Sequence, residues 1–108
     1  MLLFFLGACS THETLADNAC IDGAVLQVAL EDCHPSDCIT DVHAECSARG
    51  RGELTVQATL SYSTEGACMT DDCGPAKVAR CTPSFDPEAH TPVHFDDATR
   101  LWGELPEC

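Results

Sequence analysis

The chain is poor in basic residues and has no apolar run long enough to cross a membrane. Its 108 residues include five Lys or Arg against 18 Asp or Glu, which gives a formal net charge of -13. Nucleic acids and anionic lipid surfaces would repel such a chain, so the sequence excludes both as partners. The apolar run at residues 1–6 falls well short of the roughly 20 residues that a membrane span needs. With 44% hydrophobic and 21% charged residues, the composition is that of one globular domain.

Common catalytic motifs are also absent. The chain contains no G-x-S-x-G, no H-E-x-x-H and no C-x-x-C. These motifs provide an activated serine, a catalytic metal site and a thiol–disulfide exchange site, respectively. No oriented nucleophile and base can be named in their place. We therefore predict that the protein is not an enzyme and needs no cofactor.

Cysteine, in contrast, is abundant. Nine cysteines in so short a chain are typical of a small secreted domain that disulfides stabilise. A spacing of C-x4-C-x7-C occurs twice, 35 residues apart, first at Cys33, Cys38 and Cys46 and then at Cys68, Cys73 and Cys81. This repeat indicates either a duplicated hairpin or equivalent strands in a two-sheet fold.

The apolar pattern predicts strands rather than helices. Apolar and polar residues alternate over residues 41–49 and again over 53–62, with Gly50-Arg51-Gly52 between them, a pattern that favours a β-hairpin. Residues 24–30 are more continuously apolar and suit a central strand. Shorter strands are expected at residues 77–82, 93–95 and 100–105, and the prolines between residues 83 and 92 predict an irregular loop. The expected fold is all-β: a small disulfide-stapled antiparallel β-sandwich, of which an immunoglobulin-like arrangement is one form.

The N-terminus carries the most specific motif. Residues 1–6 and the sequence Leu6-Gly7-Ala8-Cys9 resemble the signal peptide and lipobox of bacterial lipoproteins. The resemblance implies cleavage before Cys9, a diacylglycerol on its sulfur and acylation of the new N-terminus, and two acylated points anchor a soluble domain stably. In such lipoproteins an Asp directly after the lipidated cysteine would suggest retention in the inner membrane. This chain has Ser10 at that position, which favours the outer membrane.

One feature departs from that resemblance, because no Lys or Arg precedes Cys9 and signal peptides usually begin with positive charge. The alternative is that residues 1–9 form a buried strand or an uncleaved stub. On the lipoprotein interpretation, the chain divides into a signal peptide at residues 1–8, the lipidated Cys9 with a flexible tether at 9–19, and a disulfide-rich β domain at 20–108.

Setting Cys9 aside leaves an even set of cysteines, which can close four disulfides with no spare thiol. The set comprises Cys20, Cys33, Cys38, Cys46, Cys68, Cys73, Cys81 and Cys108. Guided by the repeat and the expected strands, we pair Cys46 with Cys81, Cys33 with Cys38, Cys68 with Cys73 and Cys20 with Cys108. This is one of 105 possible connectivities.

A metal site is the main alternative for some of these residues. Cys33, Cys38, His43 and Cys46 offer ligands that zinc or copper accepts. However, the strand pattern places His43 and Cys46 on opposite faces, and the second copy of the repeat has no histidine.

Two other polar clusters carry weaker signals. Asp71-Asp72 and Asp96-Asp97 could supply carboxylates to calcium, although the chain has no EF-hand loop. His90 and His94 are separated by Pro92 and would lie too far apart on a strand to share an ion. We expect both histidines to be exposed in a loop beside Asp96 and Asp97.

The sequence therefore favours a lipoprotein of the cell envelope, anchored in the outer membrane and facing the periplasm or the outside. The expected role is structural, or the binding of another envelope protein or a glycan. Its partners are then the membrane, through the lipid anchor, and that protein or glycan. The alternative is a metal-binding envelope lipoprotein that uses zinc, copper or calcium.

Overall fold

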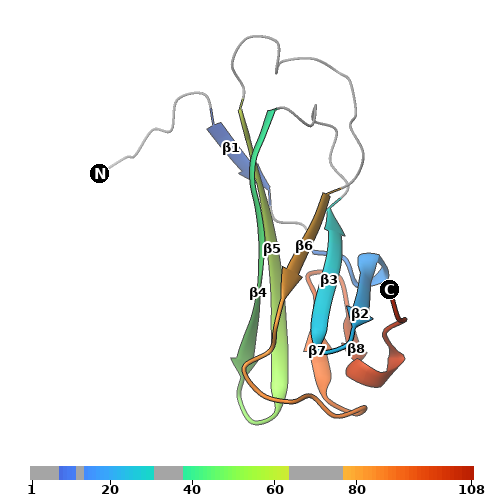
Figure 1. Cartoon of the computed structure of the whole chain (residues 1–108). Coiled ribbons are helices and arrows are strands. Elements are labelled where there is room, and N and C mark those ends of the chain that lie inside the picture. Colours follow the sequence, from blue (N-terminus) through green and yellow to red (C-terminus); the bar gives the residue numbers. More distant parts are fainter. Residues whose placement is uncertain (1–7, 12–13, 31–37, 64–76) are drawn as a thin grey trace.

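The computed structural model describes residues 8–11, 14–30, 38–63 and 77–108, with only the backbone described for residues 8–11 and 63. They form a two-sheet β-sandwich, as predicted (Figure 1). Its strands are β1 (Ala8–Thr11), β2 (Ala19–Asp22), β3 (Val25–Leu30), β4 (Ile39–Arg49), β5 (Glu53–Ser63), β6 (Lys77–Cys81), β7 (Pro92–His94) and β8 (Thr99–Leu101). Two short 3-10 helices, η1 (Ala16–Asn18) and η4 (Trp102–Glu104), complete the described elements. None of the described helices is long and apolar enough to cross a membrane.

The β4–β5 hairpin is the largest unit and confirms the sequence prediction. The two strands pair antiparallel from Arg49 and Glu53 to Ile39 and Tyr62, with one irregularity near Ile39. Gly50 and Gly52 in the connecting turn have φ values of 57° and 74°. Only glycine adopts this conformation without strain, which explains why the turn contains two glycines.

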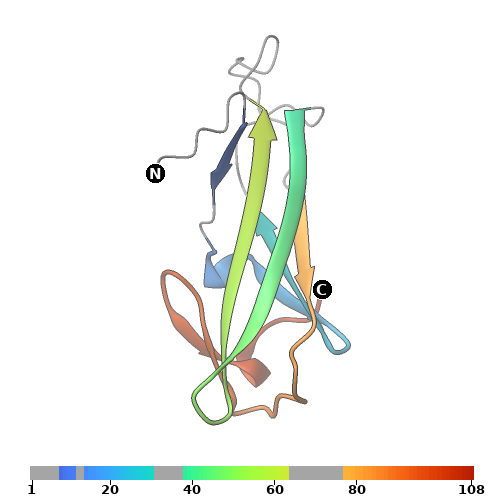
Figure 2. The same ribbon diagram turned by 90° about the vertical axis from the view of Figure 1, so that its left-hand side faces the viewer.

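The other edge of β5 is assembled from three separate segments. β1 pairs antiparallel with the upper part of β5, from Leu60 to Ser63. β7 pairs in parallel with its lower part, at Leu54 and Thr55, and β8 follows β7. Figure 2 shows β1, the η1 segment and the β7–β8 hairpin one below another along this edge. The sandwich is therefore not wholly antiparallel, unlike the predicted one.

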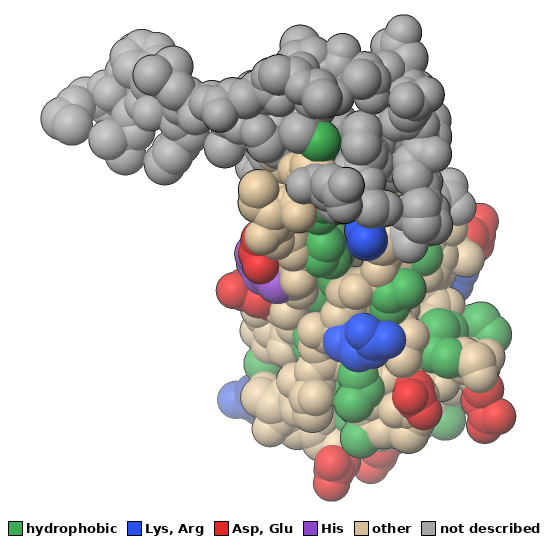
Figure 3. Space-filling model, turned by 45° about the horizontal axis from the view of Figure 1, so that its top comes forward, with side chains coloured by type: hydrophobic (Ala, Val, Ile, Leu, Met, Phe, Trp, Pro, Cys, Tyr) green, Lys and Arg blue, Asp and Glu red, His purple; other side chains and the backbone are tan. Residues whose placement is uncertain are grey.

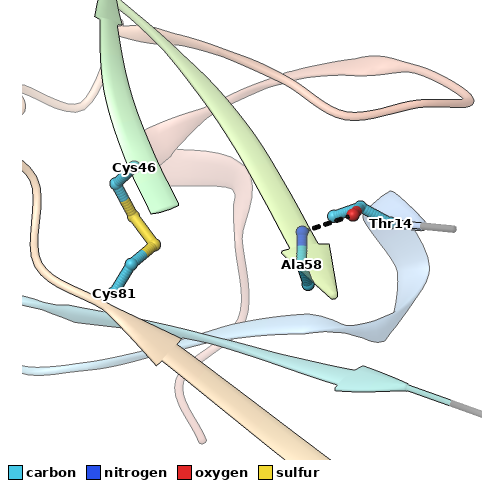
Figure 4. The surroundings of a disulfide bond; sticks show 4 residues. All are labelled: Thr14, Cys46, Ala58 and Cys81. Carbon is cyan, nitrogen blue, oxygen red and sulfur yellow. Dashed lines mark hydrogen bonds between the residues drawn. A yellow bond between two sulfur atoms is a disulfide. The ribbon is translucent and has the colours of Figure 1, made fainter. Parts of the chain in front are cut away.

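The gap in this edge is filled by Thr14. Its side chain is fully buried, and its hydroxyl oxygen accepts a hydrogen bond of 2.8 Å from the Ala58 backbone N–H (Figure 4). Ala16 and Ala19 are buried as well. The prediction of a flexible tether is thus wrong for residues 14–19, because this segment completes the edge of β5 and packs on the core.

The smaller sheet has the order β2-β3-β6, which confirms β3 as a central strand. The C-terminus runs beside β2, where Ile21 donates to the Pro106 carbonyl and accepts from the Cys108 N–H, at 2.8 and 2.9 Å. A disulfide between Cys20 and Cys108 fixes this contact. Sequence analysis did not predict β2.

Side chains from both sheets form one core. Alternate residues of β5 and β3 point inward and meet Val93 of β7, as the alternation of apolar and polar residues predicts. The largest of the fully buried apolar side chains are Leu26, Val28, Leu54, Val56, Leu60 and Val93. Each contributes about 1.5 to 3 kcal/mol by leaving water.

A disulfide between Cys46 on β4 and Cys81 on β6 joins the two sheets (Figure 4). Their Cα atoms are 5.6 Å apart. These cysteines occupy the same position in the two copies of the cysteine repeat. The repeat therefore marks equivalent strands that face each other, one of the two alternatives that it offered.

The C-terminal strand predicted at residues 100–105 is shorter than expected. The extended chain stops at Leu101, and η4 follows because the Leu105 N–H bonds back to the Trp102 carbonyl at 3.2 Å. The Glu104 carboxylate supports this turn by accepting from the Leu101 N–H at 2.8 Å. The irregular loop expected around the prolines is present, and Pro92 begins β7, a position where proline disturbs no ladder.

Candidate interaction groove

A groove of about 510 Å³ lies at the end of the domain where β4 and β5 are joined. The turn before β5 and the loop between β6 and β7 form its two walls. Its lining residues are Arg51, Gly52, Glu53, Phe85, Asp86, Glu88, His90, Thr91 and Pro92. Three carboxylates and one guanidinium make the groove predominantly acidic, while Phe85 and Pro92 add apolar surface.

The loop wall is held rigidly by Thr91 and η4. Thr91 is buried, its hydroxyl accepts from the Glu88 N–H at 2.9 Å, and its N–H donates to the Glu88 carbonyl at 3.0 Å. Trp102 and Gly103 donate backbone hydrogen bonds of 2.8 Å to Thr91 and Ala89, respectively. A Cβ atom at Gly103 would lie 2.9 Å from the Ala89 carbonyl oxygen, so only glycine permits this close approach.

The opposite wall is fixed through Glu53. Its carboxylate is 2.6 Å from His94 Nε2, and His94 Nδ1 is 3.0 Å from the Thr99 hydroxyl. A neutral imidazole satisfies both contacts by donating from Nε2 to the carboxylate and accepting at Nδ1 from the hydroxyl. The contacts of Glu53, His94 and Thr99 link β5, β7 and β8 across the outer face of the larger sheet, and they orient Glu53 at the groove.

The two histidines near the groove differ from the prediction and from each other. His90 is exposed, with 80% of its side chain accessible and Nε2 3.0 Å from the Glu88 carboxylate. His94 is only 21% accessible and belongs to β7 rather than to a loop. The prediction of two exposed loop histidines is therefore wrong for His94, which lies in the short strand predicted at residues 93–95 and pairs with Thr55.

Asp96 and Asp97, the candidate calcium ligands, instead hold the N-terminal segment. Asp96 accepts from the Thr14 N–H at 2.8 Å, and Asp97 accepts from the Ala16 N–H at 2.9 Å. Sequence analysis missed this role, and it missed Thr14 as a structural residue. Asp71 and Asp72 lie outside the described residues.

The ligand set of the metal alternative is not assembled. Cys46 is bonded to Cys81 and Cys38 is also in a disulfide, whereas zinc binds the thiolate form of cysteine. His43 is exposed and 3.0 Å from the Asp41 carboxylate. Within the described parts of the chain, no group of three or more His, Cys, Asp or Glu side chains is placed to hold one metal ion.

Two of the four predicted disulfides are confirmed, namely Cys46–Cys81 and Cys20–Cys108. The two predicted local pairs involve Cys33, Cys68 and Cys73, which lie outside the described residues.

Cys9, the predicted lipidation site, is on β1 opposite Tyr62 of β5. Tyr62 is nine residues from Glu53 along the same strand, a separation of roughly 30 Å at about 3.3 Å per residue. Cys9 and the groove therefore lie toward opposite ends of the hairpin. Comparison of the chain with protein-family models, curated proteins and solved structures finds no match.

Proposed function

We propose that this protein is an outer-membrane lipoprotein that binds another envelope protein or a glycan and has no catalytic activity. The observation that carries the proposal is the sequence Leu6-Gly7-Ala8-Cys9 combined with the position of Cys9, toward the opposite end of the hairpin from the groove. An anchor at one end and a binding surface at the other would leave the groove accessible to a partner.

The disulfides support a location in the oxidising cell envelope. Cys20, Cys38, Cys46, Cys81 and Cys108 are all bonded, and disulfides persist in such compartments rather than in the reducing cytosol. Because nine cysteines cannot all pair with one another, at least one sulfur remains for another use. Acylation of Cys9 would account for the odd number.

The groove supports an interaction role through its shape and charge. Arg51, Glu53, Asp86 and Glu88 offer ionic groups at its walls, and Phe85 offers an apolar contact. In the space-filling view, acidic side chains lie mostly around the margin of the visible face, and basic side chains lie both near its middle and at its margin (Figure 3). We assign binding to the groove because its walls combine these ionic groups with an apolar contact.

The proposal is tested by the intact mass of the native protein from the membrane fraction of a Gram-negative host, with and without alkylation before any reduction. The expected product begins at Cys9, carries a diacylglycerol and an N-acyl chain, and takes up no alkylating reagent. The control is Cys9→Ser, which should remain unprocessed and carry no lipid. An uncleaved, unmodified wild-type chain would show instead that residues 1–9 form a stub or a strand of the mature protein.

A further inference from the structure

The connection between Cys9 and the core of the domain is very short. Cys9 and Thr11 are paired with Tyr62 and Leu60 of β5. Thr14 is already fully buried and bonded to Ala58. Only two residues lie between the end of β1 and Thr14, so the connection is much shorter than the predicted tether of residues 9–19.

The segment after Thr14 is held just as firmly. The carboxylates of Asp96 and Asp97 accept from the backbone N–H groups of Thr14 and Ala16. The Asp96 N–H in turn donates to the Thr14 carbonyl at 2.9 Å. These bonds attach the N-terminal segment to the β7–β8 hairpin, so a pull on Cys9 is transmitted directly to the sandwich.

We infer that the lipid anchor holds the domain directly at the membrane surface, without a tether, with the Tyr62 end of β5 toward the lipid and the groove away from it. This inference rests on the proposed acylation of Cys9. It goes further than an anchor alone, because an anchor followed by a flexible tether would leave the domain free to take any orientation.

The register of the strands defines the end that faces the lipid. Tyr62 lies opposite both Cys9 of β1 and Ile39 of β4. In the smaller sheet, Lys77 pairs with Leu30, and it shares with Ile39 a shallow depression of about 360 Å³. These residues therefore belong to the same end of the sandwich, the end that carries β1 in Figure 1.

In this orientation the acidic groove lies far from the lipid, whereas Asp41 and Lys77 lie at the lipid end. Glu53, Asp86 and Glu88 line the groove, roughly 30 Å from the Cys9 end when the rise along β5 is counted. This is more than three Debye lengths at physiological ionic strength, where one is about 8 Å. The acidic groove would thus be screened from anionic headgroups, and it could meet partners that lie a few nanometres above the bilayer.

The test uses the lipidated, isotope-labelled protein in zwitterionic nanodiscs that contain a lipid with a gadolinium chelate on its headgroup. NMR signals of amides near this lipid are broadened beyond detection. The expected result is loss of the Ser61 and Tyr62 amide signals and retention of those of Gly50 and Gly52. Equal loss, or equal retention, at the two ends would overturn the inference.

The matched control is a variant with about 20 Gly and Ser residues inserted between Cys9 and Ser10, a linker whose average span is about 25 Å. In this variant the Ser61 and Tyr62 signals should return, and if both proteins give the same pattern, the inference is wrong.

The intact mass of each sample separates the two proposals. An unlipidated Cys9 refutes the proposed function, whereas a lipidated protein with no difference between its ends refutes only the orientation.

Discussion

The two edges of β5 are completed in different ways. On one side, β4 pairs with it along almost its whole length and is joined to it by a tight turn. On the other side, the partners are β1, Thr14 and β7, which are far apart in the sequence. We refer to these as the continuous edge and the composite edge of β5.

The difference shows that a sheet edge need not be closed by a strand. Where neither β1 nor β7 reaches, the Ala58 N–H would be left unpaired, and a buried unpaired N–H costs about 1 to 3 kcal/mol. The Thr14 hydroxyl replaces the missing carbonyl. The composite edge therefore depends on two short ladders and the Thr14 side chain, whereas the continuous edge depends on one long ladder and a disulfide.

The largest effect is expected from removing the disulfide that ties the continuous edge to the smaller sheet. The double variant Cys46→Ala with Cys81→Ala frees a loop of 35 residues, for which chain entropy predicts a loss of about 4 kcal/mol in the free energy of unfolding. Chemical denaturation under non-reducing conditions measures it. Ser47→Ala, at the exposed neighbour of Cys46 on β4, is the matched control and should change little. A loss below about 1 kcal/mol for the double variant would mean that the ladder alone supports this edge.

The next largest effect tests the composite edge. Thr14→Val keeps the shape of the buried side chain but removes the oxygen that accepts from Ala58, so it should cost about 2 kcal/mol. Thr14→Ser keeps the hydroxyl and should cost less, since it loses only a methyl group. The two free energies of unfolding are compared under the same conditions. If Val proves more stable than Ser at this position, packing rather than the hydrogen bond closes the gap.

The contrast between the edges also explains what the sequence could predict. The hairpin could be predicted because the alternation of apolar and polar residues and the two turn glycines lie within one short stretch. The pairing of Cys46 with Cys81 could be predicted from the cysteine repeat. The composite edge could not be predicted, because no local pattern indicates that Thr14 lies beside Ala58 or that β7 runs parallel to β5. These contacts join segments about 40 residues apart or more and are decided by the folded core.

The candidate groove was missed for a similar reason. Its walls come from the β4–β5 turn and from the loop between β6 and β7, which the sequence predicted only as a turn and an irregular loop. The partnership of Glu53 with His94 spans 41 residues and matches no motif. The anchor at Cys9 rests, in contrast, on a resemblance carried by four consecutive residues, and it stays a prediction.

A smaller effect is expected at the turn of the continuous edge. Gly52 has a φ of 74° with open space around its Cα, so Gly52→Ala adds conformational strain but no clash. The expected loss is about 1 to 2 kcal/mol. Arg51→Ala, between the two glycines, is the control, because its φ is not positive. Thermal unfolding of both variants measures the difference, and equal stability would mean that the turn adapts to a side chain.

The smallest effect concerns the composite edge and links it to the anchor. Asp97→Ala removes the acceptor of the Ala16 N–H, which should cost about 0.5 to 1.5 kcal/mol and chiefly weaken the N-terminal segment. Native-state hydrogen exchange should therefore show lower protection at Ala16 and little change at Val56 in the core. Asp86→Ala serves as the control, since this carboxylate lies at the groove. If protection falls equally at Ala16 and Val56, the segment opens only when the whole domain unfolds, and a load on Cys9 would be borne by the core itself.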